Sequence, residues 1–179
     1  MKPLVDQLAT ITKKFTDTFG DLTETELNWK PADNKWSIAQ NIQHIMLLNR
    51  SYFEKFDAIK QGNNKLPFIS RLNFFVKRSG SIIKPYTDPA RKTTGKTFDI
   101  WAPENTQFPK SIIADFDVHQ QLFAKYLEEL EVFFNRKTRI AYPGKLPLVF
   151  DLETACQLLV THEERHFNQA KEVLDKSKN

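Results

Sequence analysis

The stretch that decides the fold is LETACQLLVTHEERHFNQAKEVLDK, residues 152–176. Its apolar residues recur every three or four positions, which is the spacing of one face of an α-helix. We expect Asp151 to cap this helix. Glu153 falls in its first turn and lysines fall near its end, where each charge suits the helix dipole. The pattern predicts one long helix that turns an apolar stripe toward a core.

Two histidines of this helix, His162 and His166, lie about 40° apart on the helical wheel. They share the stripe with Ala155, Leu158, Leu159, Gln169 and Val173. A buried imidazole without a polar partner is costly, and one divalent metal ion satisfies two rings at once. The pair therefore indicates a metal site, against the alternative of two core histidines with ordinary hydrogen bonds.

The letters His162-Glu163-x-x-His166 also match the H-E-x-x-H motif of zinc metalloproteases. Such enzymes need a third ligand further along the chain, and no histidine follows residue 166. Gln169 and Glu172 stand where the extended motif has Gly and His. We expect Glu163 and Glu164 to be solvated or ion-paired residues on the flank of the helix, so a protease is not favoured.

Three further long helices are predicted. Apolar spacing places the first at about residues 3–19, before Gly20, and the third from Lys110 through Leu130. The second begins at Ser37, because Ser37 and Gln40 form a capping box and Trp36 can act as its hydrophobic staple. It continues to about Lys60. Four amphipathic helices without convincing strands predict an all-α fold, a four-helix bundle.

The second and third long helices are separated by residues 61–108, which contain several prolines and three of the five glycines. We expect a short helical turn around SRLNFFVKRSG (70–80) and otherwise irregular chain. Residues 61–110 hold nine Lys and Arg against three Asp and Glu. This basic segment is expected to be a solvated loop that lies over the bundle mouth and attracts an anionic ligand. Residues 135–150 are expected to connect the last two helices.

The second long helix supplies a third histidine. His44 lies at the edge of that helix's apolar stripe, where it can reach inward toward a polar rim with Gln40, Asn41 and Ser51. Two ligands on one helix and a third on a facing helix make a three-His site with open positions, as catalytic zinc sites have. His119 lies on an apolar face of the third long helix and stays open as a core residue, a fourth ligand or an outer partner.

Length and composition limit the number of domains, the cellular location and the cysteine chemistry of the protein. With 179 residues, 40% of them hydrophobic, the chain is long enough for one domain over 1–179. No signal peptide or membrane span is evident, so we expect a cytoplasmic protein without membrane contact. The single Cys156 cannot form an internal disulfide and is expected to be a small buried residue.

Three motifs together resemble a known family. They are Leu27-Asn28-Trp29-Lys30-Pro31, then Lys35-Trp36-Ser37-Ile38-Ala39-Gln40 leading to His44, and His162-Glu163-Glu164-Arg165-His166-Phe167-Asn168-Gln169-Ala170. In this order they resemble the DinB-like (YfiT-like) superfamily of metalloenzymes. The resemblance implies a four-helix bundle, a homodimer, and one divalent metal on His44, His162 and His166. It also implies relatives that are thiol S-transferases using bacillithiol or mycothiol, and a maleylpyruvate isomerase.

These observations favour an enzyme in which Zn²⁺ or Ni²⁺ activates a low-molecular-weight thiol or water toward a small electrophilic substrate, as an S-transferase or hydrolase. The alternative is a non-catalytic metal-binding module for stress response or interaction. A structural metal would recruit a fourth protein ligand, for which His119 is the candidate. Nucleic-acid binding is disfavoured, because the basic segment carries no recognition signature.

Overall fold

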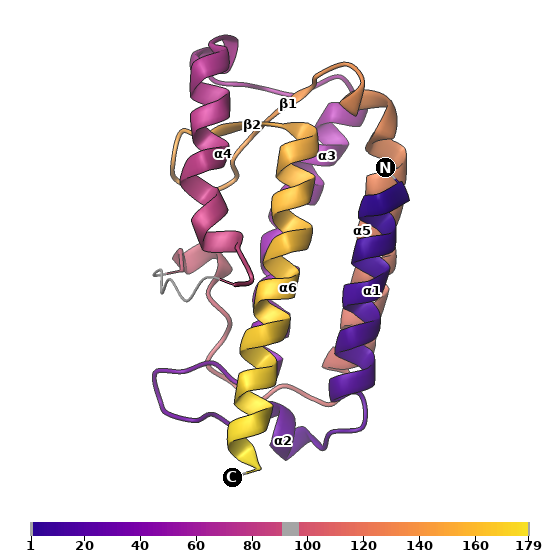
Figure 1. Ribbon diagram of the computed structural model, residues 1–179, viewed down its shortest axis with the longest axis vertical. Coiled ribbons are helices and arrows are strands. Elements are labelled where there is room, and N and C mark those ends of the chain that lie inside the picture. The colour runs from indigo at the N-terminus through magenta and orange to yellow at the C-terminus, as the bar shows by residue number, and fades with distance from the viewer. Residues whose placement is uncertain (1, 91–96, 179) are drawn as a thin grey trace.

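The computed structural model describes residues 2–90 and 97–178. Four long helices run side by side along the longest axis of the molecule (Figure 1). They are α1 (Lys2–Phe19), α3 (Ile38–Lys60), α5 (Ile112–Phe134) and α6 (Leu152–Ser177). Both α1 and α3 pack against α5 and α6, so the four helices enclose one core. The predicted all-α fold is confirmed.

Aromatic side chains fill much of this core. Phe15 of α1 lies 4.7 Å from Phe116 of α5 and 5.3 Å from Phe167 of α6, measured between ring centroids. Phe53 of α3 similarly lies 5.8 Å from Phe123 of α5. These contacts join all four helices. Each ring buries a large apolar area and so stabilises the core.

Among the described residues, no helix has both the length and the apolarity to cross a membrane.

Capping boxes fix where two of the helices begin. Ser37 Oγ accepts a hydrogen bond from the Gln40 backbone at 3.1 Å, and Gln40 Oε1 accepts one from the Ser37 backbone at 3.1 Å. The predicted start of α3 is therefore confirmed. A second capping box, between Thr23 and Glu26, begins the short helix α2 (Glu24–Asn28).

The segment 61–108 is more regular than expected. It contains the 3-10 turns η1 (Phe68–Arg71) and η2 (Asp99–Trp101), and between them the 15-residue helix α4 (Asn73–Thr87). The prediction of a short helical turn in irregular chain is wrong for residues 81–87. α4 packs against α6, and Gly80 faces Thr154 there: a Cβ on Gly80 would lie 3.5 Å from Thr154 Cγ2, an ordinary contact distance.

Residues 135–150 contain a strand pair, where the sequence predicted only a connector. β1 (Arg139–Ala141) pairs antiparallel with β2 (Val149–Asp151), and Ile140 lies opposite Phe150. Both of these side chains are fully buried, so the hairpin closes one end of the core.

The predicted cap at the start of α6 is also corrected. Asp151 occupies the cap position, but its side chain makes no capping hydrogen bond. Its carboxylate lies 3.9 Å from Arg139 Nε across the strand pair. The first backbone N–H of α6, on Leu152, donates to the Thr138 carbonyl at 2.8 Å. The residue before β1 thus satisfies one N–H of the first turn, although not one of the two that a cap side chain normally reaches.

Candidate metal centre

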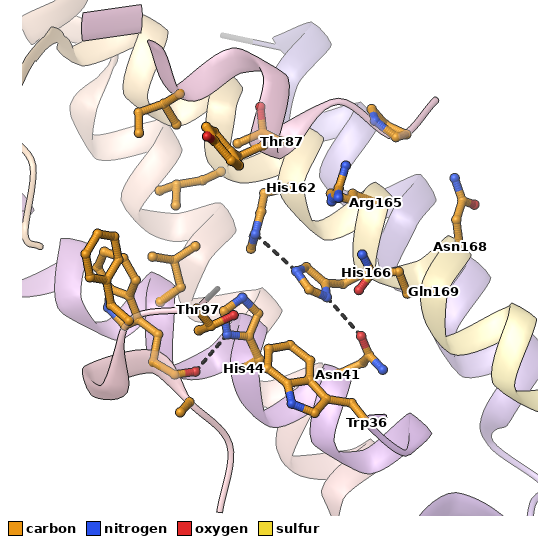
Figure 2. Close-up of a pocket in the computed structure, with 18 of the residues that line it drawn as sticks. Trp36, Asn41, His44, Thr87, Thr97, His162, Arg165, His166, Asn168 and Gln169 are labelled. Carbon is orange, nitrogen blue, oxygen red and sulfur yellow. Dashed lines mark hydrogen bonds between the residues drawn. The ribbon is translucent and has the colours of Figure 1, made fainter. Parts of the chain in front are cut away.

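Three imidazoles converge between α3 and α6. The ring centroid of His44 lies 4.5 Å from that of His166 and 5.2 Å from that of His162, and the two α6 rings lie 4.4 Å apart. One ring nitrogen from each of the three falls within 4.8 Å of the others. Figure 2 shows the three rings turned toward one another from the two helices. The structure thus brings together the three residues proposed as ligands.

The partner of His44 fixes which of its nitrogens is free. Nδ1 of His44 lies 2.7 Å from the Trp101 carbonyl oxygen. A carbonyl oxygen can only accept, so Nδ1 carries the hydrogen and Nε2 keeps its lone pair. Trp101 is in turn held because its Nε1 donates to Ser51 Oγ at 3.1 Å.

His166 is oriented in the same way by Asn41. The Asn41 amide nitrogen donates to the Ser37 carbonyl at 2.9 Å, which turns the amide oxygen toward His166. His166 Nδ1 donates to that oxygen at 2.9 Å, and the lone pair on Nε2 faces His162 Nε2 at 3.1 Å. Asn41 therefore holds His166 as outer partners hold metal-ligating histidines.

Burial keeps all three rings neutral. Desolvation lowers the pKa of His44 to about 4, and it lowers the pKa of His162 and of His166 well below the usual value. Nε2 of His162 and Nε2 of His166 share one hydrogen bond, and His162 is its donor because the Nδ1 atom of His166 carries that ring's hydrogen. A divalent cation fits such a donor set, because each Nε2 can coordinate while Nδ1 of His44 and of His166 keeps its hydrogen bond.

The centre opens onto a cavity of about 1350 Å³. The Trp36 ring forms part of its wall: its centroid lies 4.9 Å from that of His44 and 5.9 Å from that of His166. Trp36 thus contacts the site itself, rather than serving only at the helix start. Asn168 and Gln169, one turn beyond the histidines on α6, line the cavity further out (Figure 2).

The basic segment does reach this cavity, but through other side chains than expected. Ile82, Tyr86 and Thr87 of α4 line it, and so do Phe98 and Trp101, whereas none of the segment's described Lys or Arg residues does. The described part of the segment therefore contributes a mainly apolar wall, which also contains Thr97 and Asp99. Arg91, Lys92 and Lys96 fall outside the described residues.

Two other proposed outer residues lie apart from the imidazole cluster. Gln40 completes the capping box, and its Nε2 donates to the Glu104 carbonyl at 2.9 Å. His119 lies elsewhere in the core, stacked on Phe53 at 5.1 Å and 3.3 Å from the Asn49 amide nitrogen. His119 is not a member of the three-His group.

The predicted environment of Glu163 is wrong. It was expected on the solvated flank of α6, but it is fully buried. Its carboxylate accepts hydrogen bonds from Asn49 Nδ2 at 2.7 Å and from Gln120 Nε2 at 2.5 Å. Burial raises its pKa to about 7. The carboxylate is committed to α3 and α5, so it does not act as the base that a metalloprotease requires at this position.

Two expectations about neighbouring residues are confirmed. Glu164 is partly exposed and pairs with Lys14 at 3.0 Å. Cys156 is fully buried, and burial raises the pKa of its thiol, so it stays a protonated, inert side chain. Neither residue belongs to the cavity wall.

The order of helices and the position of the histidines agree with a family comparison. The family model described as the DinB superfamily matches residues 7–170, which include all three histidines of the cluster. Neither the search of curated proteins nor the search of solved structures gave a match. The chain belongs to the DinB superfamily.

Proposed function

We propose that this protein is a cytoplasmic metal-dependent enzyme whose site uses His44, His162 and His166 to hold one Zn²⁺ or Ni²⁺ ion. Its reaction joins a nucleophile, a low-molecular-weight thiol or water, to a small electrophilic substrate. It is therefore an S-transferase or a hydrolase. The observation that carries the proposal is the convergence of three neutral imidazoles on a large open cavity.

A divalent cation held by three neutral imidazoles supplies Lewis acidity, which favours the deprotonated form of a thiol or a water molecule at an open position. The residues of the chain do the rest. Trp101 and Asn41 fix the tautomers of His44 and His166. Trp36 stacks on the His166 ring, lies tilted against the His44 ring, and shields both from solvent on one side. Asn168 and Gln169 offer amide groups to a polar thiol.

A non-catalytic metal-binding module is the alternative. A structural metal site closes its coordination shell with a fourth protein ligand, and His119 was the candidate. Among the described residues the three-His group has no fourth His, Cys, Asp or Glu member, and His119 contacts Phe53 and Asn49 instead. This arrangement supports the open, catalytic version of the site.

The experiment is a thiol-transfer assay on metal-loaded protein with bacillithiol, mycothiol or glutathione and a generic electrophile such as an alkyl halide. A parallel assay without thiol measures hydrolysis of an ester. We expect activity in one of the two assays, lost in His44→Ala and retained in His119→Gln. Equal rates in wild type and His44→Ala would contradict the enzymatic proposal.

The family resemblance also suggests that the protein is a homodimer. Light scattering on the eluting peak of a size-exclusion column tests this, and a mass of one chain of 20.9 kDa would contradict it.

A further inference from the structure

One side of the cavity next to the imidazoles is an aromatic and aliphatic chamber. Trp101 of η2 and Tyr142 beside β1 form its back, with ring centroids 5.4 Å apart. Leu48 of α3 and Leu159 of α6 also line the cavity and are nearly fully buried. Four separate parts of the chain thus place apolar side chains against the same space. A concave space lined by apolar side chains from several elements is typical of a preformed small-molecule site.

Three large apolar side chains in this cavity remain exposed to solvent. Ile82 and Tyr86, one turn apart on α4, are 41% and 48% exposed, and Leu146 in the hairpin turn is 41% exposed. Contact of apolar side chains with water is unfavourable, and a partner that covers them gains in proportion to the area it buries. Grouped in a concave site, such area marks where an apolar part of a ligand binds.

The chamber is fixed in place relative to the three histidines. The backbone carbonyl of Trp101 holds His44 at 2.7 Å, so the residue that forms the back of the chamber also orients one proposed ligand. Gly144 lets the two rings close: a Cβ there would lie 2.5 Å from Tyr142 Cε1 and 2.9 Å from Trp101 Cη2. A group that binds against Trp101 therefore lies beside the imidazoles.

The opposite end of the cavity differs in chemistry. Asn168 and Gln169 present amide groups beyond His166 (Figure 2). In the chamber, by contrast, burial raises the pKa of Tyr142 to about 12, so this phenol is uncharged at physiological pH. The site thus has an apolar end and a polar end, and its lining also includes the charged residues Lys35, Arg165, Glu172 and Lys176.

We infer that the electrophilic substrate of this site carries an aromatic or branched aliphatic group next to its reactive carbon. That group binds against Trp101, Tyr142 and Ile82, and the polar nucleophile approaches from the Asn168 end. Ile82 and Leu146 then determine specificity without touching the imidazoles. This inference rests on the function proposed above, because it assigns a substrate class to the same site.

Equilibrium binding of two hydroxamates to the zinc-loaded protein tests the inference. Both acetohydroxamate and phenylacetohydroxamate can chelate zinc, and only the second carries an aryl group. We expect the aryl compound to bind at least about tenfold more tightly, because it covers the exposed apolar area of the chamber. In Ile82→Ser the advantage should fall to about threefold or less, while acetohydroxamate binds as before. Leu122→Ser is the matched control, since Leu122 is 44% exposed on α5, outside the cavity.

The outcomes separate the inference from the function on which it rests. Equal affinity for the two hydroxamates, or an advantage that survives Ile82→Ser together with Leu146→Ser, overturns the inference and leaves the metal site intact. Failure of both to bind, with no zinc uptake, overturns the proposed function. Phenylacetamide binding to the metal-free protein then tests whether the chamber binds an aryl group without a metal. Weaker binding to Ile82→Ser than to wild type supports the inference. No binding to wild type, or equal binding to both proteins, overturns it.

Discussion

Two polar clusters lie on neighbouring sides of α6 and differ in how their atoms are satisfied. On one side, His162 and His166 face His44, and the Nε2 atoms of the two α6 rings approach to 3.1 Å. On the other side, the carboxylate of Glu163 meets two amide donors, Asn49 Nδ2 and Gln120 Nε2. His162 and Glu163 are consecutive in the sequence, yet one cluster opens on a cavity and the other is sealed.

The difference shows what each cluster needs. In the sealed cluster, donors meet acceptors, so the protein alone compensates the burial of a polar group. In the open cluster, three imidazoles converge without a carboxylate between them, and we propose that a cation from outside completes the arrangement. The letters H-E-x-x-H therefore combine a proposed binding element with a structural one, and the glutamate belongs to the structural part.

The largest expected effect comes from the open cluster. His162→Ala should weaken Zn²⁺ or Ni²⁺ binding by more than about 100-fold, the upper range for loss of an outer-shell partner, because it removes a direct ligand. Thermal unfolding with and without added metal measures this: wild type gains stability and the variant does not. A metal-dependent gain in His162→Ala equal to that of wild type would remove the distinction between the clusters.

Next comes the sealed cluster, where Glu163→Leu should lower the free energy of unfolding by about 3 kcal/mol. The change leaves the Asn49 and Gln120 amides buried without their acceptor. Glu164→Gln is the control, because a partly exposed ion pair contributes about 1 kcal/mol or less. Urea unfolding of the metal-free proteins compares the two. Similar losses at 163 and 164 would contradict the assignment of a structural role to Glu163.

A smaller effect is expected at Asn41, which orients one ring without being a ligand. Asn41→Leu should reduce metal affinity by about 10- to 100-fold while one ion per chain still binds. A titration of metal into metal-free protein gives both affinity and stoichiometry. Unchanged affinity would mean that the Asn41–His166 hydrogen bond has no influence on the centre.

A separate effect depends on pH. Burial lowers the pKa of His119 to about 4, so between pH 6.5 and 4 the unfolded chain takes up a proton at His119 that the folded protein does not. His119 therefore lowers the free energy of unfolding of the metal-free protein as pH falls through this range. Glu163 acts in the opposite direction, because its pKa is raised to about 7.

Comparing wild type with His119→Gln isolates the contribution of His119, since Glu163 and the three histidines of the metal centre are present in both proteins. We expect the difference in unfolding free energy between wild type and His119→Gln to shift against wild type as pH falls from 6.5 toward 4. Urea unfolding at several pH values measures it. A difference that does not depend on pH would show that His119 titrates normally in the folded protein.

Much of the bundle could be predicted because its helices have regular apolar stripes and explicit start signals. The capping box at Ser37 and Gln40 locates the start of α3 within one residue. The four-residue spacing of His162 and His166 places both rings on one face. Convergence with His44 needed only two facing helices, which the bundle supplies.

The missed features have physical reasons. The buried face of α4, which packs against α6 and β2, contains Ser79 and Gly80, while Phe74 on the same helix is 67% exposed, so its apolar periodicity misleads. The burial of Glu163 was missed because a wheel for one helix assumes one buried face, and α6 packs against neighbours on several sides. The available signal was Asn49 and Gln120, polar residues within apolar stripes of their own helices.

The central claim is that three imidazoles, and no fourth side chain, hold one divalent cation. Anomalous diffraction from crystals grown with Zn²⁺ tests it most directly. The account predicts one strong peak about 2.0–2.1 Å from Nε2 of His44, His162 and His166, with the remaining positions open to solvent. A peak that includes His119 or Glu163 as a ligand, or no peak between α3 and α6, would contradict it.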